Sequence, residues 1–537
     1  MRDRLWRGCR SVAVVAIGAV ALTACASADG QGSGESAGGG EYSIGYVGER
    51  AVDDAAVDGG VVTYGSYGFP ATLDPTKTLM AGSTGGTELA AIYDTLVRYD
   101  FEKSEYVPQL AASLKSSDGG QTWTITLREG GTFSDGTPVD SVAVKWSFDR
   151  YVAAKRDAAQ MWTNTVAGVE TPDAKTVVIK LQRSWADFPV MLSSGPGVIV
   201  APSSEANGAF TPIGAGPFAV TRFAPNEVLE LAPRADYVGG KPRLAGLRFV
   251  PTPNAQGMFE SMRSGELNAG YLYRNTEVID SAIDAGYEGY LDTQGLGAIG
   301  IINQREGRPG ADVRVRRAIS LGVDPDALNQ RVNSGNSPAG SSMFPEGSKW
   351  HNGEAAGVAY DPDKARELLN EAKADGYDGK LTYAAINEEG ARQGALAVQA
   401  ALDSIGFDVE IAYANSVTDL TRRVYIDRDF DVARSGASLI DAAPLLRLYA
   451  SLGSTSNNNA AGYNSPEMDA LLVKLQTAGD DGDKQKVIDD IQMLANETVP
   501  YAVWAPSVVF TAWTPKLHGA NVTIDNVVLF DDAWMEQ

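Results

Sequence analysis

Strand-like and helix-like hydrophobic patterns follow one another along the chain from about residue 59 onward. Trp123, Ile125 and Leu127 alternate with polar residues, which is the spacing of a strand that buries one face. After Asp140 the apolar residues instead recur every three or four positions, as in an amphipathic helix, and an aspartate there can cap the helix N-terminus. Strands and helices that alternate in this way predict an α/β fold.

Further elements are marked by their first residues and their apolar spacing. Asp361 and Ser465 are each followed by proline, and a capping side chain before proline at the first helical position predicts a helix. Residues 484–498 carry an apolar stripe at helical spacing, and residues 177–181 alternate like a second half-buried strand. The glycine-rich residues 82–86 lack the Gly-Lys-Ser/Thr ending of a phosphate-binding loop and are predicted to form a turn.

The composition argues against several classes of site. The 537 residues carry a net charge of −23, so we expect the chain to repel nucleic acid and anionic lipid headgroups, and we predict no nucleic-acid partner. The only cysteines, Cys9 and Cys25, lie near the N-terminus, which leaves no disulfide framework for the body of the protein. The only histidines, His351 and His518, are far apart in the sequence, so we predict no metal site and no cofactor.

The N-terminus has the organisation of a secretory signal. A basic start precedes an apolar run at residues 12–22, which is about half the length of a membrane-spanning helix. The sequence Leu-Thr-Ala-Cys at residues 22–25 resembles the bacterial lipobox, which implies a lipid anchor on Cys25; an ordinary signal peptide with a chance cysteine is the alternative. Residues 25–58, rich in glycine and serine, are predicted to form a flexible tether. We therefore expect a protein anchored to the outer face of the cell membrane.

Several short motifs occur in a fixed order along residues 59–537. They are Thr-Leu-Asp-Pro at 72–75, Ile-Tyr-Asp-Thr-Leu-Val-Arg-Tyr at 92–99, Val-Pro-Gln-Leu-Ala-Ala-Ser at 107–113, Trp-Thr-Ile-Thr-Leu-Arg at 123–128, Phe-Ser-Asp-Gly-Thr-Pro-Val at 133–139, Val-Lys-Trp-Ser-Phe at 144–148, Gly-Ala-Gly-Pro-Phe at 214–218, Tyr-Val-Gly-Gly-Lys-Pro at 237–242, Ser-Gly-Glu-Leu at 264–267, Val-Arg-Val-Arg-Arg-Ala at 313–318, Asp-Pro-Asp-Lys-Ala at 361–365 and Asn-Ser-Pro-Glu-Met-Asp at 464–469. Together they resemble the family 5 solute-binding proteins of ABC importers, which include the dipeptide- and oligopeptide-binding proteins.

This resemblance implies a periplasmic-binding-protein fold of class II, with two α/β lobes joined by crossover strands. Lobe I would consist of residues 59–86, 205–300 and 503–537, with a subdomain inserted at 87–204, and lobe II of residues 301–502. It also implies a monomer that binds a small solute, by family default a peptide, in the cleft between the lobes. The protein would deliver that solute to ABC permease and ATPase subunits by lobe closure, without catalysis.

The family's peptide-binding motif is only partly kept. Peptide-binding relatives carry Arg-x-Gly-Trp-x-x-Asp, in which the aspartate pairs with the peptide's amino end and, in some, the arginine helps to hold the carboxylate. Arg434 and Gly436 match this motif, but Ala437 and Ile440 stand in place of its tryptophan and aspartate. Since isoleucine offers no partner to a buried ammonium group, a ligand without a free amine becomes an alternative: a blocked peptide, a glycan, a larger conjugate or a metal chelate.

The resemblance also indicates candidate ligand-binding residues. Asp441 could replace the missing aspartate if a local bulge brought it round, although on a regular strand it would point away from the side of Ile440. Arg434 could grip a carboxylate, or it could instead form a structural salt bridge with an acid such as Asp429 or Asp431. The remaining candidates are Tyr67, Gly68 and Phe69 in the loop before residues 73–75, together with Asn303, Gly436, Ser438 and Trp504. Core packing is the alternative for Tyr67, Phe69 and Trp504.

Two other functional classes remain as alternatives. A lipid-anchored hydrolase would share the signal and the tether, but the chain has no Gly-x-Ser-x-Gly or His-Glu-x-x-His motif, and its two histidines leave few possible bases for a nucleophile. An envelope sensor could keep the same fold without an importer. A solute-binding protein is therefore the prediction, and an enzyme is not expected.

Overall fold

A computed structural model describes residues 42–49, 56–155, 158–206 and 208–536. The secretory signal, the lipobox and Cys25 lie outside these residues, and so does most of the predicted tether. Within the described ranges, no helix combines the length and the apolar character needed to cross a bilayer.

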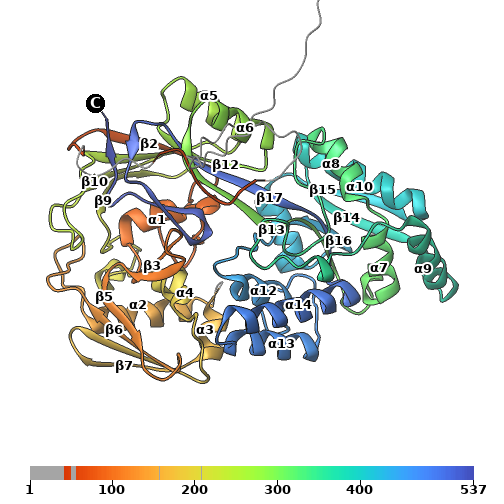
Figure 1. The fold of residues 1–537 in the computed structure, drawn as a ribbon, viewed down its shortest axis with the longest axis horizontal. Helices are drawn as coiled ribbons and strands as arrows, with labels where there is room; N and C mark the ends of the chain where they lie inside the picture. Colours follow the sequence, from red (N-terminus) through yellow and green to blue (C-terminus); the bar gives the residue numbers. More distant parts are fainter. Residues whose placement is uncertain (1–41, 50–55, 156–157, 207, 537) are drawn as a thin grey trace, which may run out of the picture. The chain divides into compact units, whose positions relative to one another are not determined.

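An 11-stranded sheet runs through the described body, in the order β15-β14-β16-β13-β17-β12-β2-β11-β10-β9, with β1 pairing to β13 (Figure 1). At its centre two long strands, β13 and β17, pair antiparallel and are buried along most of their length. They connect β12, β2, β11, β10 and β9 on one side with β16, β14 and β15 on the other. The strands are β1 (Gly45–Val47), β2 (Val61–Ser66), β9 (Phe218–Ala224), β10 (Val228–Pro233), β11 (Gly246–Pro251), β12 (Ala269–Tyr273), β13 (Glu288–Ile302), β14 (Lys380–Ile386), β15 (Asp408–Ala414), β16 (Val432–Ser435) and β17 (Tyr501–Trp513).

Helices with one apolar face cover both parts of this sheet. The helices α7 (Val313–Leu321), α9 (Pro362–Ala374) and α10 (Glu389–Ile405) share an apolar core with β14 and β15, and α8 (Pro325–Asn333) packs against α10. On the other part, α5 (Ala255–Arg263) and α6 (Thr276–Asp284) pack against β12 and β17. The alternating patterns in the sequence arise from these layers, because each element buries one side against the next.

A second sheet confirms the strands predicted from the alternation at Trp123, Ile125 and Leu127 and at residues 177–181. It has four antiparallel strands in the order β5-β6-β8-β7 and packs with α2 (Ser141–Ala153) and α3 (Ala159–Thr165). As predicted, Asp140 caps α2, and its Oδ1 accepts a hydrogen bond from the Ala143 backbone N–H at 2.8 Å. The strands are β5 (Ala111–Ser116), β6 (Thr122–Leu127), β7 (Val166–Asp173) and β8 (Thr176–Leu181).

The capped helices also form where their signals place them. Asp361 accepts a hydrogen bond from the Lys364 N–H at 2.9 Å, and Ser465 accepts one from the Met468 N–H at 3.2 Å at the start of α13 (Pro466–Thr477). The last predicted helix, α14 (Asp481–Thr498), begins three residues before Lys484, because Asp480 rather than a later residue caps it.

Two sequence-based predictions are corrected. Residues 82–86 are not a simple turn: they form a 3₁₀ helix (Gly82–Thr84) that leads into helix α1 (Gly86–Tyr93). The predicted tether is wrong for residues 42–49, since β1 pairs with β13 and the Tyr46 ring packs edge-on against Tyr290 at 5.0 Å. The apolar side chains of Ile44 and Tyr46, which pack against a hydrophobic core, account for this ordered segment within a glycine-rich stretch.

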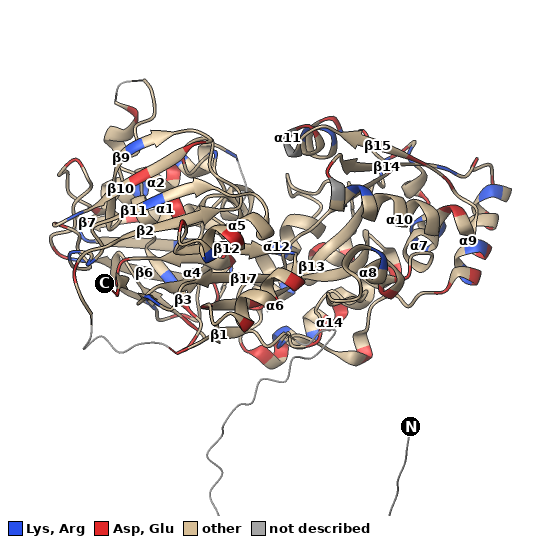
Figure 2. Ribbon diagram, turned by 90° about the horizontal axis from the view of Figure 1, so that it is seen from above, with Lys and Arg blue, Asp and Glu red and all other residues tan. Residues whose placement is uncertain are grey.

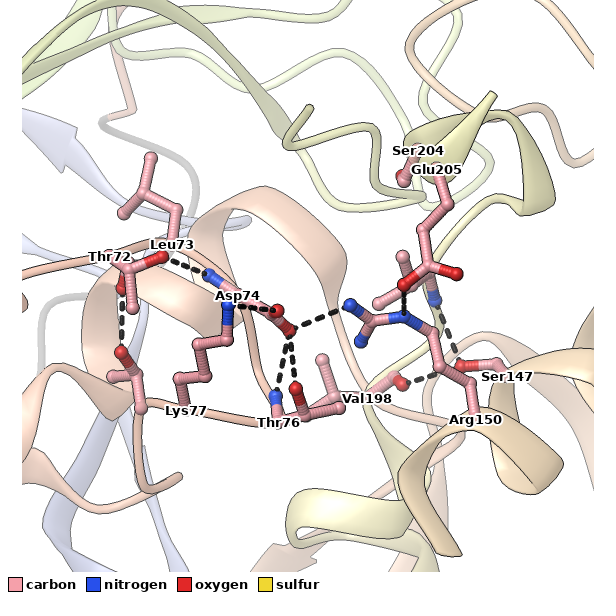
Figure 3. Close-up of polar contacts among 12 residues, drawn as sticks. Thr72, Leu73, Asp74, Thr76, Lys77, Ser147, Arg150, Val198, Ser204 and Glu205 are labelled. Carbon is pink, nitrogen blue, oxygen red and sulfur yellow. Dashed lines mark hydrogen bonds and ion pairs between the residues drawn. The ribbon is translucent and has the colours of Figure 1, made fainter. Parts of the chain in front are cut away.

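A buried ion pair joins the loop at residues 72–78 to helix α2. Figure 3 shows Asp74 facing Arg150, whose Nη2 lies 2.9 Å from Asp74 Oδ1, while Glu205 accepts from Arg150 Nε at 2.8 Å. Hydrogen bonds from Thr76 and the charge of Arg150 hold the pKa of Asp74 below its usual value, although burial opposes this. The Leu-Asp-Pro motif therefore has a structural role: its aspartate fixes this loop to α2.

Candidate functional site

Two cavities of opposite charge lie along the segment from Arg434 to Asp441. The first, here called the basic cavity, is lined by Arg274 and Arg434, by residues of β13 and β17, and by α8 and α10. The second, here called the acidic cavity, is lined by Asp292, Asp441 and Asp525 among others. Both also contact β13, through residues 297 and 298 in the basic cavity and through Tyr290 and Asp292 in the acidic one.

Arg434 projects from β16 into the basic cavity, and neither of the two acids considered as its salt-bridge partners pairs with it. Asp429 and Asp431 both pair with Arg308, at 3.3 Å, and not with Arg434. Among the described residues Arg434 has no ion pair and no hydrogen bond. Burial lowers the pKa of its guanidinium, and the positive charge of Arg274 lowers it further. The salt-bridge alternative is therefore wrong.

Trp504 also lines the basic cavity, from β17. It is 2% exposed, and its ring centroid lies 6.4 Å from that of Tyr383, another lining residue. Its Nε1–H has no partner within the described residues. A buried indole N–H without an acceptor costs free energy unless a ligand or water supplies one, so Trp504 remains a candidate binding residue.

The loop at residues 67–69 lies partly beside this cavity. Tyr67 packs edge-on against Tyr273 at 5.3 Å, and the charges of Arg274 and Arg434 both lower its pKa, against a larger rise from burial. Gly68 packs on backbone, since a Cβ there would lie 2.3 Å from Ser83 O. Phe69 stacks on Phe223, with ring centroids 6.3 Å apart. None of the three residues lines the basic cavity itself, although the charges of its two arginines reach Tyr67.

Asn303 does not line either cavity. It is fully buried after β13, where its Nδ2 donates to the carbonyl oxygens of Arg428 at 3.1 Å and Phe430 at 2.9 Å. Its Oδ1 accepts from Arg305 Nη1 at 3.1 Å. These contacts satisfy the amide, so the structure gives Asn303 a structural role rather than the predicted binding role.

The segment after β16 brings Asp441 into the acidic cavity together with Ile440. Ser438 has a left-handed backbone (φ 49°), and Leu439 forms an isolated bridge with Gly295, so the regular alternation of a strand is interrupted. Asp441 Oδ1 accepts from Ser348 Oγ at 2.6 Å and its Oδ2 accepts from the Lys349 N–H at 2.8 Å. Burial raises the pKa of Asp441, and the hydrogen bond from Ser348 opposes this.

Two residues of these cavities carried no recognised signal in the sequence. Arg274 follows the aromatic strand β12, and an arginine at a strand end is too common to mark a site. Asp292 is a carboxylate within the long buried strand β13, where burial raises its pKa to about 6 and hydrogen bonds from Asn526 and Gln294 oppose the rise. A carboxylate in the interior of a long strand that is buried along most of its length was the signal that could have identified it.

Known proteins resemble this chain in sequence and in fold. The sequence profile of the bacterial extracellular solute-binding proteins, family 5 (middle part), matches residues 105–459. A Brucella ovis protein named as an ABC transporter peptide-binding protein is 30% identical over 386 residues, which cover 68% of this chain and 70% of that protein.

Solved structures extend the likeness to nearly the whole described body. The Helicobacter pylori periplasmic binding protein DppA, in complex with the peptide STSA, superposes with a TM-score of 0.75 at 22% identity, over 90% of this chain and 99% of that one. The Bacillus subtilis oligopeptide-binding protein AppA, in complex with a nonapeptide, superposes with a TM-score of 0.75 at 20% identity. The superposition covers 90% of this chain and 100% of AppA. The predicted fold class is confirmed, and the chain belongs to the bacterial extracellular solute-binding proteins, family 5.

Proposed function

We propose that this chain is the extracytoplasmic solute-binding component of an ABC importer, and that its solute is a peptide with free ends. The observation that carries the proposal is the pair of oppositely charged cavities along residues 434–441. A peptide zwitterion presents an ammonium group at one end and a carboxylate at the other. Asp441 and Asp292 can take the ammonium, and Arg434 can take the carboxylate through charge-assisted hydrogen bonds. The peptide-binding names of the relatives support this assignment.

The spacing of the cavities favours a short peptide over a single amino acid. Asp292 lines the acidic cavity and Ala298, six positions later on β13, lines the basic one. Six strand residues extend about 20 Å, and the irregular pairing near Ala298 shortens this. Because an extended peptide rises about 3.3 Å per residue, a peptide of four to six residues would reach both cavities.

The same geometry accounts for delivery without catalysis. Residues from both sides of the central strands line the basic cavity, so a ligand there contacts both sides at once and favours the arrangement in which they enclose it. The permease and ATPase of the importer would then act on the enclosed form. Lipid attachment at Cys25, the outer face of the cell membrane as its location, the monomeric state and the lobe boundaries given above belong to this proposal.

A thermal-shift and calorimetry series tests the function. The probes are alanine peptides of two to six residues, each with free ends, with an acetylated amino end or with an amidated carboxyl end. We expect the free four- to six-residue peptides to raise the unfolding midpoint most, because ligand binding stabilises the folded state by mass action.

Equal stabilisation by blocked and free peptides would contradict the two-ended assignment. Arg434→Gln should weaken binding of free peptides and leave amidated peptides unaffected. Mass spectrometry of the peptides after incubation tests the hydrolase alternative, and the appearance of cleavage products would contradict the proposal.

A further inference from the structure

The basic cavity carries two positive charges and no negative one. Arg274 and Arg434 are the charged residues among those that line it. Among the described residues neither guanidinium forms an ion pair. On the surface, charges of both signs are mixed, as Figure 2 shows along α9, so this cavity differs from the rest of an acidic protein. Two arginines held together without a carboxylate need a counter-charge from outside the protein.

The structure holds Arg274 in place for this role. Arg274 follows β12 with a left-handed backbone (φ 59°), and its guanidinium lies over the Tyr273 ring, 4.5 Å from the centroid. Its Nη2 donates to Gly297 O at 2.8 Å, while its Nε has no partner among the described residues. Gly436 is needed beside it, since a Cβ there would lie 2.6 Å both from Arg274 Nη2 and from its acceptor, Gly297 O. The glycine of the partly kept family motif thus makes room for a second arginine.

Other polar groups in the wall of the cavity are also unpartnered. Ser507 Oγ, Tyr383 OH and Trp504 Nε1 are buried and have no hydrogen-bond partner within the described residues, and the three residues are 4%, 1% and 2% exposed. Buried donors without acceptors are costly, and all three can donate to anionic oxygens. With the two guanidinium groups they form a set of donors suited to a group with several negatively charged oxygens.

We propose that the basic cavity binds an end group of the solute that carries two negative charges, and that Arg274 binds the second charge. This inference rests on the proposed function and specifies the solute further. The shared chemistry is a dianionic group, either two neighbouring carboxylates or a phosphate. A single carboxylate would leave one guanidinium without a counter-charge. The cavity volume of about 90 Å³ suits an end group, because pockets for whole ligands typically measure about 300–1,000 Å³.

One acid of the protein lies close enough to be considered as the second counter-charge. This acid is Glu388, an exposed residue at the N-terminus of α10. Its charge raises the pKa of Tyr67, whereas the charges of the two arginines lower the same pKa. It forms no ion pair with Arg274 or Arg434 among the described contacts. If Glu388 were the counter-charge, a solute with a single carboxylate would bind best and Glu388→Gln would reverse that preference.

The test compares pentapeptides that begin with four alanines and differ in the charged groups at their carboxyl end. Calorimetry measures an asparagine peptide, which ends in one carboxylate, an aspartate peptide, which ends in two, and a phosphoserine peptide with an amidated end, which carries a phosphate alone. In the unaltered protein we expect at least one of the two dianionic peptides to bind about 10-fold more tightly than the asparagine peptide, the effect of one additional charge-assisted contact. The preference between the aspartate and phosphoserine peptides separates the two sources of charge.

Variants assign that preference to Arg274. Arg274→Gln should remove the 10-fold advantage of the dianionic peptides over the asparagine peptide. Gly436→Ala, which keeps the guanidinium but displaces it, should reduce the advantage in the same direction. Arg222→Gln, at an exposed arginine on β9, is the matched control and should keep it. Unfolding midpoints without peptide establish that each variant is folded.

The outcomes separate this inference from the proposed function. Equal affinities for the asparagine peptide and both dianionic peptides would overturn the inference and leave peptide binding intact. If no peptide binds, the peptide function is wrong, and inorganic phosphate and succinate then decide the inference by thermal shift. Stabilisation by either anion but not by acetate, lost in Arg274→Gln, would support the dianionic site; no such stabilisation would overturn it.

Discussion

Arg434 and Arg316 are both at least partly removed from solvent, but among the described residues only Arg316 has hydrogen-bond partners. Arg316 Nε donates to Thr498 O and its Nη1 to Gly310 O, each at 2.8 Å. Arg434 has none among the described residues. Arg316 therefore has the contacts of a structural arginine and Arg434 those of a binding arginine. A buried charge without a partner lowers stability, whereas a hydrogen-bonded one supports it.

Replacing each arginine by methionine should have opposite effects on stability. Arg434→Met removes an uncompensated charge and should raise the free energy of unfolding of the unliganded protein by about 1 kcal/mol, while the binding of free peptides is weakened. Arg316→Met leaves backbone carbonyls without donors and should lower it by about 2 kcal/mol. Denaturant unfolding measures both. Destabilisation by Arg434→Met would indicate a structural partner for this residue.

The single residue Glu88 makes the stability of the folded protein depend on pH. It is 1% exposed, its Oε1 accepts from Ser66 Oγ at 2.5 Å, and burial raises its pKa to about 7. Since the folded state holds this proton more tightly than the unfolded chain, the stabilisation is complete below pH 4 to 5 and is lost as the pH rises toward and through 7.

Glu88→Gln should therefore flatten the pH profile. Between pH 4.5 and 7.5 the unaltered protein should lose on the order of 3 kcal/mol through this group alone, and the variant should lack that loss. Unfolding midpoints across the pH range measure the difference. Glu266→Gln, at an exposed position, is the control, and a profile unchanged by Glu88→Gln would contradict the assignment.

At the scale of elements, β1 is the clearest departure from expectation. Its Tyr46 packs on Tyr290, and the Tyr46 hydroxyl accepts from the Val522 N–H at 3.0 Å. Ile44 and Tyr46 also line the acidic cavity, so this strand forms part of the site. So short a strand within a glycine-rich stretch carries too weak a pattern to be predicted, and pairing with β13 supplies the missing stabilisation.

Tyr46→Ser tests the contribution of β1. We expect the free energy of unfolding to fall by about 2 kcal/mol, because a partly buried aromatic ring and a hydrogen bond to the backbone are both lost. We also expect weaker binding of free-amine peptides, since the wall of the acidic cavity is altered. Tyr360→Ser, at a tyrosine that is 47% exposed, serves as the control and should change neither quantity.

At the scale of the whole described body, contacts link the four-stranded-sheet region to α12 (Pro444–Leu452), α13 and α14. Lys484 on α14 lies 2.8 Å from Asp187, Gln476 Nε2 donates to Thr165 Oγ1 at 3.0 Å, and Asn164 Nδ2 donates to Tyr449 OH at 3.0 Å. By the proposed boundaries these contacts join the inserted subdomain to lobe II, so they favour closure.

Lys484→Met should weaken solute binding without touching either cavity. The loss of a half-buried ion pair that forms only when the two regions meet should raise the Kd for a free-ended alanine pentapeptide about 3-fold. Lys486→Met is the control on the same helix, because Lys486 pairs with Asp483 at 3.0 Å within α14. An equal effect of both variants would show that charge alone, and not this contact, is responsible.

Local rules account for what could be predicted from the sequence. Asp140, Asp361 and Ser465 cap their helices as expected, because capping involves residues three positions apart. The alternation at residues 122–127 predicted a strand because the period of side chains on a strand is local as well. The order of the motifs along the chain predicted the family and the fold class.

The sequence by itself therefore determined the elements, the fold class and Arg434 as a candidate, through spacing along the chain and similarity to relatives. Only the tertiary structure decided which charges face one another. Arg274 follows β12, Arg434 lies on β16 and Ser507 lies on β17, and the order of strands in the sheet brings all three to one cavity. Asp429 and Asp431 instead pair with Arg308. Spacing along the chain does not predict these contacts between charged side chains, because the contacts depend on how the layers of the fold pack.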